Sequence, residues 1–346
     1  MSNLLSRIHA LPKAELHVHL DGSLRPQTLI ELAREYRQHL PSEDPGEIAR
    51  YMHVTDARDL VDYLERFRIT LSVMQTADAL ERIAYELAED TAAENVRYLE
   101  VRFCPMLNTE GGLSSHDAVE AALRGLRRAE KDHGIRTGVI ICALRSLDPQ
   151  ISLQMAEVAV DFQGRGVVAF DLAGAENGNP PSEHITAFQL AADANLPITV
   201  HAGEAYGTPS IHEAIHYCHA RRIGHGTRLF EDPDLLRFVN DFRIPLEICL
   251  TSNVQTRAVT AAEEHPLRLY YDQGLMLNLN TDNRMMSGTT VTDEYLLAHR
   301  ALGFTWEELC ELAIMSFESA FLSWPEKRNL VAEARLAIDA LTAQMA

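Results

Sequence analysis

The sequence lacks two features that define common protein classes: long apolar runs and paired cysteines. No run of about 18 consecutive apolar residues occurs, so no segment is expected to span a membrane. The five cysteines, Cys104, Cys142, Cys218, Cys249 and Cys310, are scattered and form no C-x-x-C pair. A disulfide framework and a thiolate zinc site are therefore both disfavoured, and this usage fits a reducing compartment.

Basic residues are also scarce, with 31 Lys and Arg against 50 Asp and Glu, a formal net charge of −19. A surface of this sign repels phosphate backbones and anionic lipid, so neither nucleic acid nor a membrane surface is an expected partner. It suits a neutral or cationic small molecule, although many cytosolic enzymes are acidic for no catalytic reason. The opening MSNLLSRIHALPK has no apolar stretch long enough for a signal peptide, so we expect a cytoplasmic protein.

What the sequence does contain is an alternation of short apolar runs with amphipathic segments. The runs are rich in Val, Ile and Leu and bounded by Gly, Pro, Asp or Asn, which is typical of strands buried on both faces of a parallel sheet. They cover residues 14–20, 96–104, 137–144, 166–172, 196–201, 222–225, 245–250 and 275–280. Helical spacing occurs between them, for example over 77–94, 116–133 and 153–163.

Eight strands that alternate with helices predict an α/β fold, a (β/α)8 TIM barrel, and we expect residues 1–346 to form this single domain. Residues from about 26 to 75 are helical in pattern and too long for a simple crossover. We interpret them as a helical insertion after the first strand that caps the barrel mouth. Catalytic residues of such barrels lie at the carboxyl ends of the strands, so polar residues that follow the apolar runs are the candidates.

The first strand ends in LHVHLDG, with His17 and His19 two positions apart. On a strand both imidazoles point to the same face, and two imidazoles on a rigid face make half of a zinc site. An isolated H-x-H is a weak signal, because such a pair is more often an ordinary core or surface feature.

Three further strand ends carry polar residues of the same kind. The fifth run ends in PITVHAGE with His201 and Glu204, the sixth ends at His225, and the eighth is followed by Asp282 and Asn283. This agreement with the barrel rule strengthens the metal interpretation. Three histidines and one carboxylate suit zinc and leave an open position for water, so the sequence predicts a metal site at the C-terminal mouth.

A second histidine pattern competes with this interpretation. Residues 212–216 read H-E-x-x-H, the metalloprotease motif, which places His212 and His216 on one helix face. Ile211, Ile215 and Cys218 form an apolar stripe on the same segment, and an amphipathic helix packed outside the barrel explains the pattern more simply.

Other candidates have structural explanations of equal merit from the residues alone. Asp21 can belong to a turn, and Gly174 in DLAGAE can serve only the backbone. The helical spacing of Leu60, Tyr63, Leu64 and Phe67 is also that of a buried core face.

Together, the segments HVHLDG, DLAG, HAGE, RIGHG and NTDN resemble the adenosine deaminase family, from about residue 12 to 295. The resemblance implies zinc-dependent hydrolytic deamination of adenosine and 2′-deoxyadenosine in purine salvage, with one Zn²⁺ per chain as the cofactor. The zinc ligands that it implies are His17, His19, His201 and Asp282.

The same resemblance implies that Glu204 protonates N1 of the purine. It also implies that His225 orients and deprotonates the attacking water with help from Asp282. Substrate contacts are implied for His19, for Asp21 at the ribose 5′-hydroxyl, for Gly174 at N3 and for Asn283, where many family members have Asp. An apolar lid is implied for Leu60, Tyr63, Leu64 and Phe67.

Several alternatives stay open at this level. They are a deaminase of adenine or of a modified adenosine, a catalytically inactive barrel that serves as a binding module, and an amidohydrolase that opens a cyclic amide. The cytidine deaminase class needs H-x-E and P-C-x-x-C, and the sequence has neither. The oligomeric state is not readable from the sequence.

Overall fold

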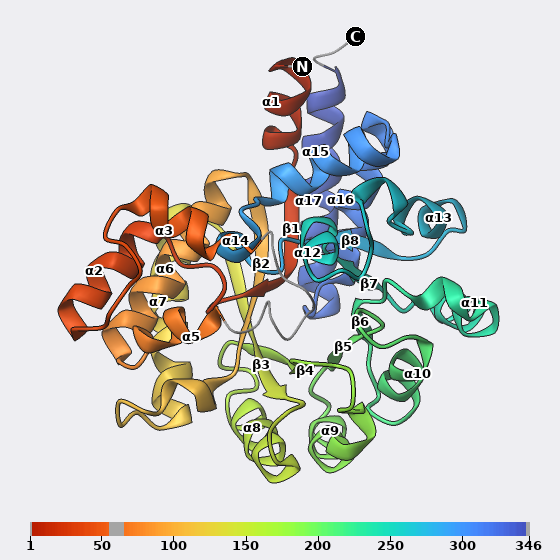
Figure 1. The fold of residues 1–346 in the computed structure, drawn as a ribbon. Coiled ribbons are helices and arrows are strands. Elements are labelled where there is room, and N and C mark those ends of the chain that lie inside the picture. Colours follow the sequence, from red (N-terminus) through yellow and green to blue (C-terminus); the bar gives the residue numbers. More distant parts are fainter. Residues whose placement is uncertain (1, 55–65, 344–346) are drawn as a thin grey trace.

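A computed structural model describes residues 2–54 and 66–343, and it is a (β/α)8 barrel with its helices packed around a ring of parallel strands (Figure 1). The expected strands are confirmed, and no boundary moves by more than three residues. The strands are β1 (Lys13–His19), β2 (Val96–Phe103), β3 (Arg136–Leu144), β4 (Val167–Ala173), β5 (Thr199–Ala202), β6 (Arg222–His225), β7 (Leu246–Ile248) and β8 (Leu277–Leu279).

The barrel is closed by two narrow junctions between four-stranded sheets, β1-β2-β3-β4 and β5-β6-β7-β8. One junction is a parallel bridge from Phe170 of β4 to Ile198, just before β5. At the other, the Asp282 N–H donates to the His17 carbonyl at 2.9 Å, and the His19 N–H donates to the Asp282 carbonyl at 2.7 Å. This second junction places both histidines of β1 directly beside Asp282.

The helices follow local start signals. Ser114 and Asp117 form a capping box at the start of α7, and Asp148 caps α8 with Pro149 in its first turn. Helix α8 therefore begins four residues before the expected 153. The outer helices are α6 (Ala77–Ala93), α7 (Ser115–His133), α8 (Pro149–Asp161), α9 (Ile185–Asp193), α10 (Thr208–His216), α11 (Pro233–Asp241) and α13 (Leu267–Asp272). The remaining helices are α1 (Ser2–Ala10), α12 (Leu250–Gln255), α14 (Arg284–Ser287), α15 (Val291–Leu302), α16 (Trp306–Ser319) and α17 (Trp324–Ala343).

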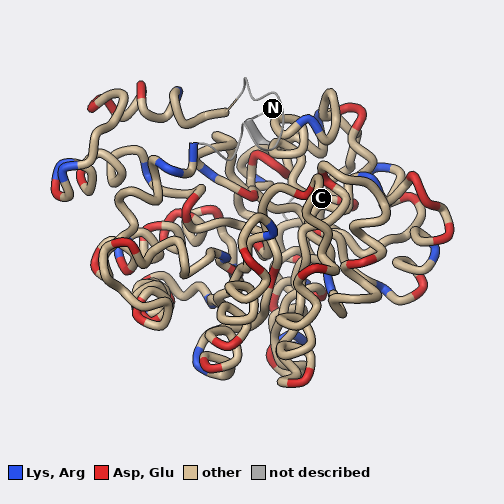
Figure 2. Tube along the Cα trace, turned by 60° about the horizontal axis from the view of Figure 1, so that its bottom comes forward, with Lys and Arg blue, Asp and Glu red and all other residues tan. Residues whose placement is uncertain are grey.

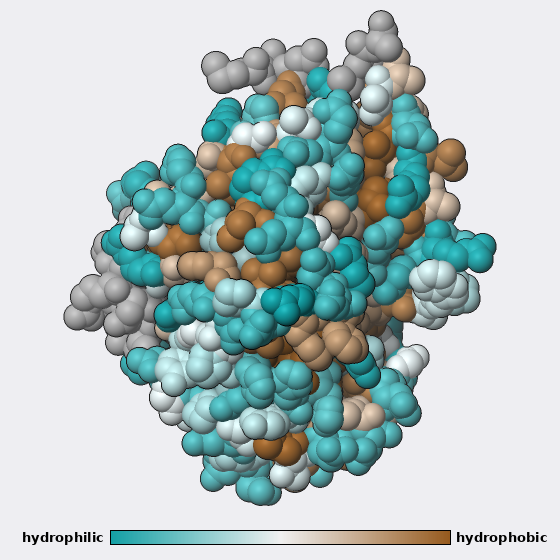
Figure 3. Space-filling view, turned by 90° about the vertical axis from the view of Figure 1, so that its right-hand side faces the viewer, coloured by the Kyte–Doolittle hydropathy of each residue, from teal (hydrophilic) through white to brown (hydrophobic). Residues whose placement is uncertain are grey.

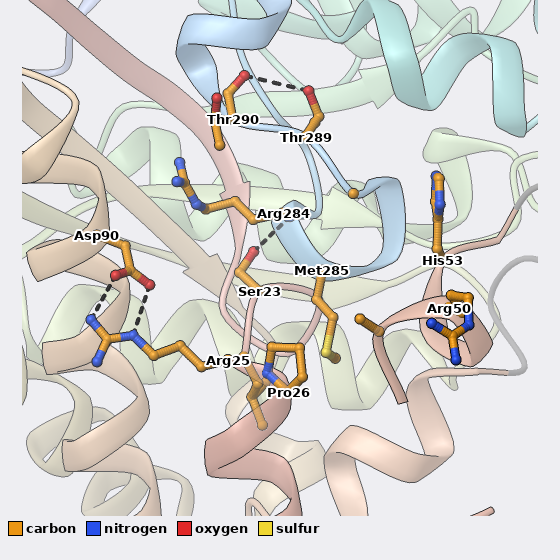
Figure 4. Close-up of a pocket in the computed structure, with 13 residues that line it drawn as sticks. Ser23, Arg25, Pro26, Arg50, His53, Asp90, Arg284, Met285, Thr289 and Thr290 are labelled. Carbon is orange, nitrogen blue, oxygen red and sulfur yellow. Dashed lines mark hydrogen bonds and ion pairs between the residues drawn. The ribbon is translucent and has the colours of Figure 1, made fainter. Parts of the chain in front are cut away.

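Helices α2 (Pro26–Tyr36), α3 (Pro45–Met52) and α5 (Phe67–Ser72) lie between β1 and α6, where the insertion is expected. Of the expected lid, Leu60, Tyr63 and Leu64 lie outside the described residues. Two contacts hold the start of the insertion in place. Arg25 contacts Asp90 of α6, and the backbone N–H of Arg284 donates to Ser23 Oγ at 3.1 Å (Figure 4). These groups border a cavity of about 410 Å³ between the insertion and α14.

The distribution of charged and apolar residues on the surface agrees with the acidic composition of the chain. Acidic residues are spread over the outer helices (Figure 2), and apolar side chains are scattered among hydrophilic ones on the face drawn in Figure 3. Within the described part of the chain, no helix is both long and apolar enough to cross a membrane.

The contact between α6 and α7 yields a prediction about stability. Gly125 of α7 packs so closely on α6 that an added Cβ would lie 2.1 Å from the Glu81 carbonyl oxygen. Helix propensity alone favours Gly→Ala by about 1 kcal/mol, whereas a clash with a neighbouring backbone typically costs about 1–3 kcal/mol. We expect Gly125→Ala to lower the thermal unfolding midpoint.

The matched control is Gly46→Ala in α3, where the new methyl group meets only the ends of two side chains, Asp44 Oδ1 at 3.2 Å and an Arg50 guanidinium nitrogen at 3.6 Å. This variant should be neutral or slightly stabilising. An increase in the midpoint for Gly125→Ala in differential scanning calorimetry would contradict the close helix contact.

Candidate active site

A cavity of about 520 Å³ opens at the carboxyl ends of the strands and gathers most of the predicted site residues. Its lining includes side chains or backbone from β1, β4, β5, β6 and the segment after β8, as well as from α5 of the insertion. The predicted residues among them are His19, Asp21, Phe67, Gly174, His201, Glu204, His225, Asp282 and Asn283.

Five of the predicted side chains converge at the floor of this cavity. Ligand atoms of His17, His201, His225 and Asp282 all lie within 4.8 Å of one another. His19 joins them, because its Nε2 lies 3.1 Å from His201 Nε2 and 3.4 Å from Asp282 Oδ1. Asp282 Oδ1 is also 3.3 Å from His17 Nε2. The group can therefore hold a metal ion.

The spacing of these atoms fits a tetrahedral zinc ion. Ligand atoms about 2.0–2.1 Å from such an ion stand roughly 3.3 Å from one another. Three of the six separations in the proposed ligand set have this length: His19 to His201 is 3.1 Å, His17 to Asp282 is 3.3 Å and His19 to Asp282 is 3.4 Å. Nε2 of His17 is buried and has no hydrogen-bond partner among the described residues. A buried nitrogen without a partner is costly unless it serves a ligand.

Two buried carboxylates orient the histidines from behind. Glu247 Oε2 lies 2.8 Å from His17 Nδ1, and Asp171 Oδ1 lies 3.1 Å from His201 Nδ1. Arg102 donates to both carboxylates, at 2.9 Å to Asp171 and 2.8 Å to Glu247. Burial lowers the pKa of His17 to about 4, so its ring stays neutral near pH 7. A neutral ring that donates from Nδ1 offers its Nε2 lone pair to a metal.

Two of the eight non-glycine residues with positive φ in the described part of the chain belong to this site. His225 and Asp282 have φ values of 63° and 61°, in the left-handed region that residues with a Cβ seldom adopt. Such residues cost of order 1–3 kcal/mol each and are found mainly at functional sites. Ser252 Oγ donates to Asp282 Oδ2 at 2.6 Å, which leaves Oδ1 to face the histidines.

A third carboxylate holds the loop that carries Glu204. The buried Glu176 side chain accepts hydrogen bonds from four successive backbone N–H groups, those of residues 203–206. A carboxylate that accepts several backbone hydrogen bonds holds the loop in one conformation. The Glu204 side chain is thereby fixed at the cavity wall.

The carboxyl group of Glu204 has two different oxygens. Oε1 accepts from Thr256 Oγ1 at 2.7 Å and from Asn253 Nδ2 at 3.3 Å. Oε2 has neither partner and lies 3.6 Å from His225 Nε2. Burial raises the pKa of Glu204, although the nearby His225 opposes this shift. The group is therefore suited to keep a proton closer to neutral pH than an exposed carboxyl.

The cavity lining also includes Asp21 and Asn283, whose Oδ1 atoms are both buried without a hydrogen-bond partner among the described residues. Burial raises the pKa of Asp21 to about 7. A residue larger than glycine at position 22 would displace the Asn283 side chain, because its Cβ would lie 1.9 Å from Asn283 Oδ1. Gly174 has a φ of 96°, so it meets a backbone need as well as lining the cavity.

The H-E-x-x-H segment lies elsewhere, on α10 outside the barrel (Figure 1). His212 and His216 are exposed, while Ile211 and Ile215 are buried. The Glu213 carboxylate accepts from the Ser182 N–H at 3.1 Å. The interpretation of this segment as an amphipathic outer helix is confirmed.

Sequence reasoning missed the residues that hold the site from behind. They are Arg102, Asp171, Glu176, Glu247, Asn253 and Thr256. A signal existed for three of them, because Arg102, Asp171 and Glu247 are charged residues within apolar strands. Charges at such positions are rare unless they are paired.

Comparison with known proteins agrees with this geometry. A family model described as adenosine deaminase matches residues 12–336. "Adenosine deaminase" of Mycobacterium sp. (strain JLS) is 44% identical over 343 residues, which covers 94% of this chain and 95% of that protein. "Probable adenosine deaminase" of Dictyostelium discoideum is 43% identical over 94% of this chain, which spans only 42% of that longer protein.

Solved structures show the same relationship. Adenine deaminase from Arthrobacter aurescens is 31% identical, with a TM-score of 0.88 over 95% of this chain and 99% of the other. A Burkhoderia ambifaria amidohydrolase with bound Zn is 27% identical, with a TM-score of 0.89 over 99% and 96%. Arabidopsis ADAL complexed with IMP is 30% identical, with a TM-score of 0.85 over 97% and 98%. The motifs, the barrel and these matches together place the chain in the adenosine deaminase family.

Proposed function

We propose that the protein catalyses the hydrolytic deamination of adenosine and 2′-deoxyadenosine to inosine and deoxyinosine, with release of ammonia, in purine salvage. The observation that carries this proposal is the buried Glu204 carboxyl group, held at a cavity wall beside a convergent His and Asp cluster. The relatives named adenosine deaminase support the substrate class.

We assign His17, His19, His201 and Asp282 as the residues that would hold one zinc ion per chain. The distances between their ligand atoms support this assignment, as does the bound Zn of the Burkhoderia neighbour. When bound, zinc lowers the pKa of a water molecule to about 7 and so supplies a nucleophile at neutral pH.

Glu204 is the proposed proton donor to N1 of the purine. Attack of oxygen on C6 places negative charge on N1, and a positioned acid that neutralises it contributes about 10²–10⁴-fold. Because Oε1 already accepts two hydrogen bonds, Oε2 is the oxygen that can carry the proton. His225 lies on the same side of the cavity, where it can orient the attacking water, and Asp282 assists it.

The protons balance over the reaction. The oxygen of water bonds to C6, and Glu204 gives its proton to N1. The proton that water loses passes to the amino group as the C6–N6 bond breaks and ammonia leaves. The hydroxyl proton on C6 returns to Glu204 as the carbonyl forms, which regenerates the acid.

The remaining contacts favour a nucleoside. Asp21 Oδ1 is buried without a partner among the described residues and offers an acceptor to the ribose 5′-hydroxyl. We assign the Gly174 N–H to N3 and Asn283 to N7. Phe67 lies at the cavity wall, and the helical insertion of the single domain forms the lid.

Adenine is the second candidate substrate, since the neighbour from Arthrobacter aurescens is an adenine deaminase. The ultraviolet spectrum changes as the adenine ring becomes hypoxanthine, so one assay can compare adenosine, deoxyadenosine and adenine directly. We expect adenosine and deoxyadenosine to be deaminated with higher kcat/KM than adenine. Faster turnover of adenine would overturn the assigned role of Asp21.

Metal content provides the first prediction on the site. Purified active protein should contain about one equivalent of zinc, and removal of the metal by a chelator should abolish turnover. The variant His212→Ala with His216→Ala should leave the metal content unchanged, because both residues lie on the outer helix. Active protein without any metal in elemental analysis would rule out the ligand assignment.

A second prediction concerns Glu204. Replacement by Gln keeps the shape of the side chain but removes the transferable proton, so kcat should fall by at least ~10²-fold while zinc content is retained. Glu263→Gln is the control, since this carboxylate is exposed. Near-normal turnover by Glu204→Gln would mean that another group protonates N1.

A third prediction concerns Asn283. N7 accepts a hydrogen bond, and loss of a donor to a buried acceptor costs about 1–3 kcal/mol. Asn283→Ala should lower kcat/KM for adenosine clearly, but much less for 7-deazaadenosine, which lacks N7. Measurement of both substrates on both enzymes closes a double cycle. Equal losses on the two substrates would instead assign Asn283 a role in holding the loop beside Asp282.

A further inference from the structure

Asn253 on α12 lies behind the two groups that are proposed to act on the substrate. It is fully buried, and its Nδ2 lies 3.1 Å from His225 Nδ1 and 3.3 Å from Glu204 Oε1. Its Oδ1 lies 3.1 Å from His265 Nε2 and 3.2 Å from Thr227 Oγ1. One side-chain amide thus contacts both His225 and Glu204, and its orientation decides what each of them can do.

The orientation can be derived from a group that cannot change its role. The backbone N–H of Leu267 points at His265 Nδ1 at 3.1 Å, and a backbone N–H can only donate. Nδ1 of His265 is therefore unprotonated. The ring is buried, which lowers the pKa of His265 to about 3, so it stays neutral. A neutral imidazole has one N–H, and in His265 it must be on Nε2.

This proton fixes the amide of Asn253. The N–H at His265 Nε2 needs an acceptor, and the Asn253 side chain can accept only through Oδ1. The reversed amide would set its NH₂ group against that N–H, and two buried donors would face each other without an acceptor. The Thr227 hydroxyl can donate to the same oxygen. The NH₂ group of Asn253 consequently faces His225 and Glu204.

We infer that Asn253, oriented by His265, is a positioning residue that places the proton of His225 on Nε2 and the proton of Glu204 on Oε2. Since Asn253 donates to His225 Nδ1, this nitrogen carries no proton, and the single N–H of the neutral ring faces the cavity. Since Asn253 and Thr256 both donate to Glu204 Oε1, the acid proton belongs on Oε2.

A proton on Nε2 excludes His225 from the metal ligands that surround it. A ligand nitrogen must offer a lone pair, and a protonated Nε2 has none, so the set that remains is His17, His19, His201 and Asp282. On the proposed function, this tautomer also gives His225 a different role. Its N–H donates to the attacking oxygen and holds it in place, whereas the sequence resemblance implied that His225 removes the proton.

Nuclear magnetic resonance of the zinc-loaded protein, labelled with ¹⁵N in its histidines, tests the inference without substrate. Two-bond ¹H–¹⁵N correlations distinguish protonated from unprotonated ring nitrogens, and the signals absent from His225→Gln identify residue 225. We expect Nε2 to be protonated and Nδ1 to be unprotonated. The opposite tautomer, or a metal-bound Nε2, would overturn the inference.

Variants test the consequence for catalysis. A carboxylate cannot donate, so Asn253→Asp should move the His225 proton to Nδ1 and lower kcat by about 10²–10³-fold, the usual effect of a lost donor at the reacting oxygen. KM should change much less, because Asn253 is not among the described residues that line the cavity. Zinc content, measured in parallel, should be unchanged.

Two variants of His265 test the same relay in case the Asn253 variant does not fold. His265→Leu removes the N–H that orients the amide, whereas His265→Gln keeps a donor near the same place and should restore most of the kcat that His265→Leu loses. Equal losses in both variants, with normal zinc content and unfolding midpoint, would overturn the relay. A wild-type protein that does not deaminate adenosine would overturn the proposed function, and the tautomer measurement would still decide the relay.

Discussion

The active site depends on one buried ion network, in which the Arg102 guanidinium lies between the carboxylates of Asp171 and Glu247. All three side chains are excluded from solvent. A buried carboxylate without a partner costs several kcal/mol, so Asp171 relies on Arg102, and Glu247 relies on Arg102 together with Arg222, whose Nε lies 2.6 Å from Glu247 Oε1. Because the same carboxylates accept from His201 and His17, the network decides how two rings of the metal cluster are oriented. Inside the barrel, the imidazoles are thus positioned by hydrogen bonds to buried carboxylates whose charge is neutralised by arginine. Apolar packing alone provides no such acceptors.

The closure of the barrel and the assembly of the cluster use the same backbone hydrogen bonds. Asp282 closes the ring of strands by pairing with residues 17 and 19, and its side chain meets those of His17 and His19 at the same place. Asp282 has a left-handed backbone conformation at this junction, and its Oδ1 lies 3.3 Å from His17 Nε2 and 3.4 Å from His19 Nε2. Strain of this kind persists only where surrounding contacts determine it, and here the barrel junction supplies them.

The surroundings shift the pKa values of two carboxyl groups at this cavity in opposite directions. Burial raises the pKa of Glu204, which stands beyond the histidine cluster. Asp282 is equally buried, but the adjacent histidines outweigh burial and hold the pKa of its carboxyl group well below the usual range. One group is thereby suited to give a proton and the other to remain an anion. Pairs of carboxyl groups separated in this way mark acid and base roles in many enzymes.

The barrel and the residues at its mouth could be predicted from local patterns, because each strand and the polar residues that follow it are neighbours along the chain. Apolar runs bounded by turn residues predicted all eight strands, and His17, His201, Glu204, His225 and Asp282 stood at their ends. The groups that hold these residues in place are brought to them only by the folded chain. Asn253 and His265 give no local signal, since their roles come from the contacts of Asn253 with residues 204 and 225, which follow two other strands of the barrel. Hydrogen-bond direction is a property of the assembled network, so the positions of the protons cannot be read from spacing along the chain.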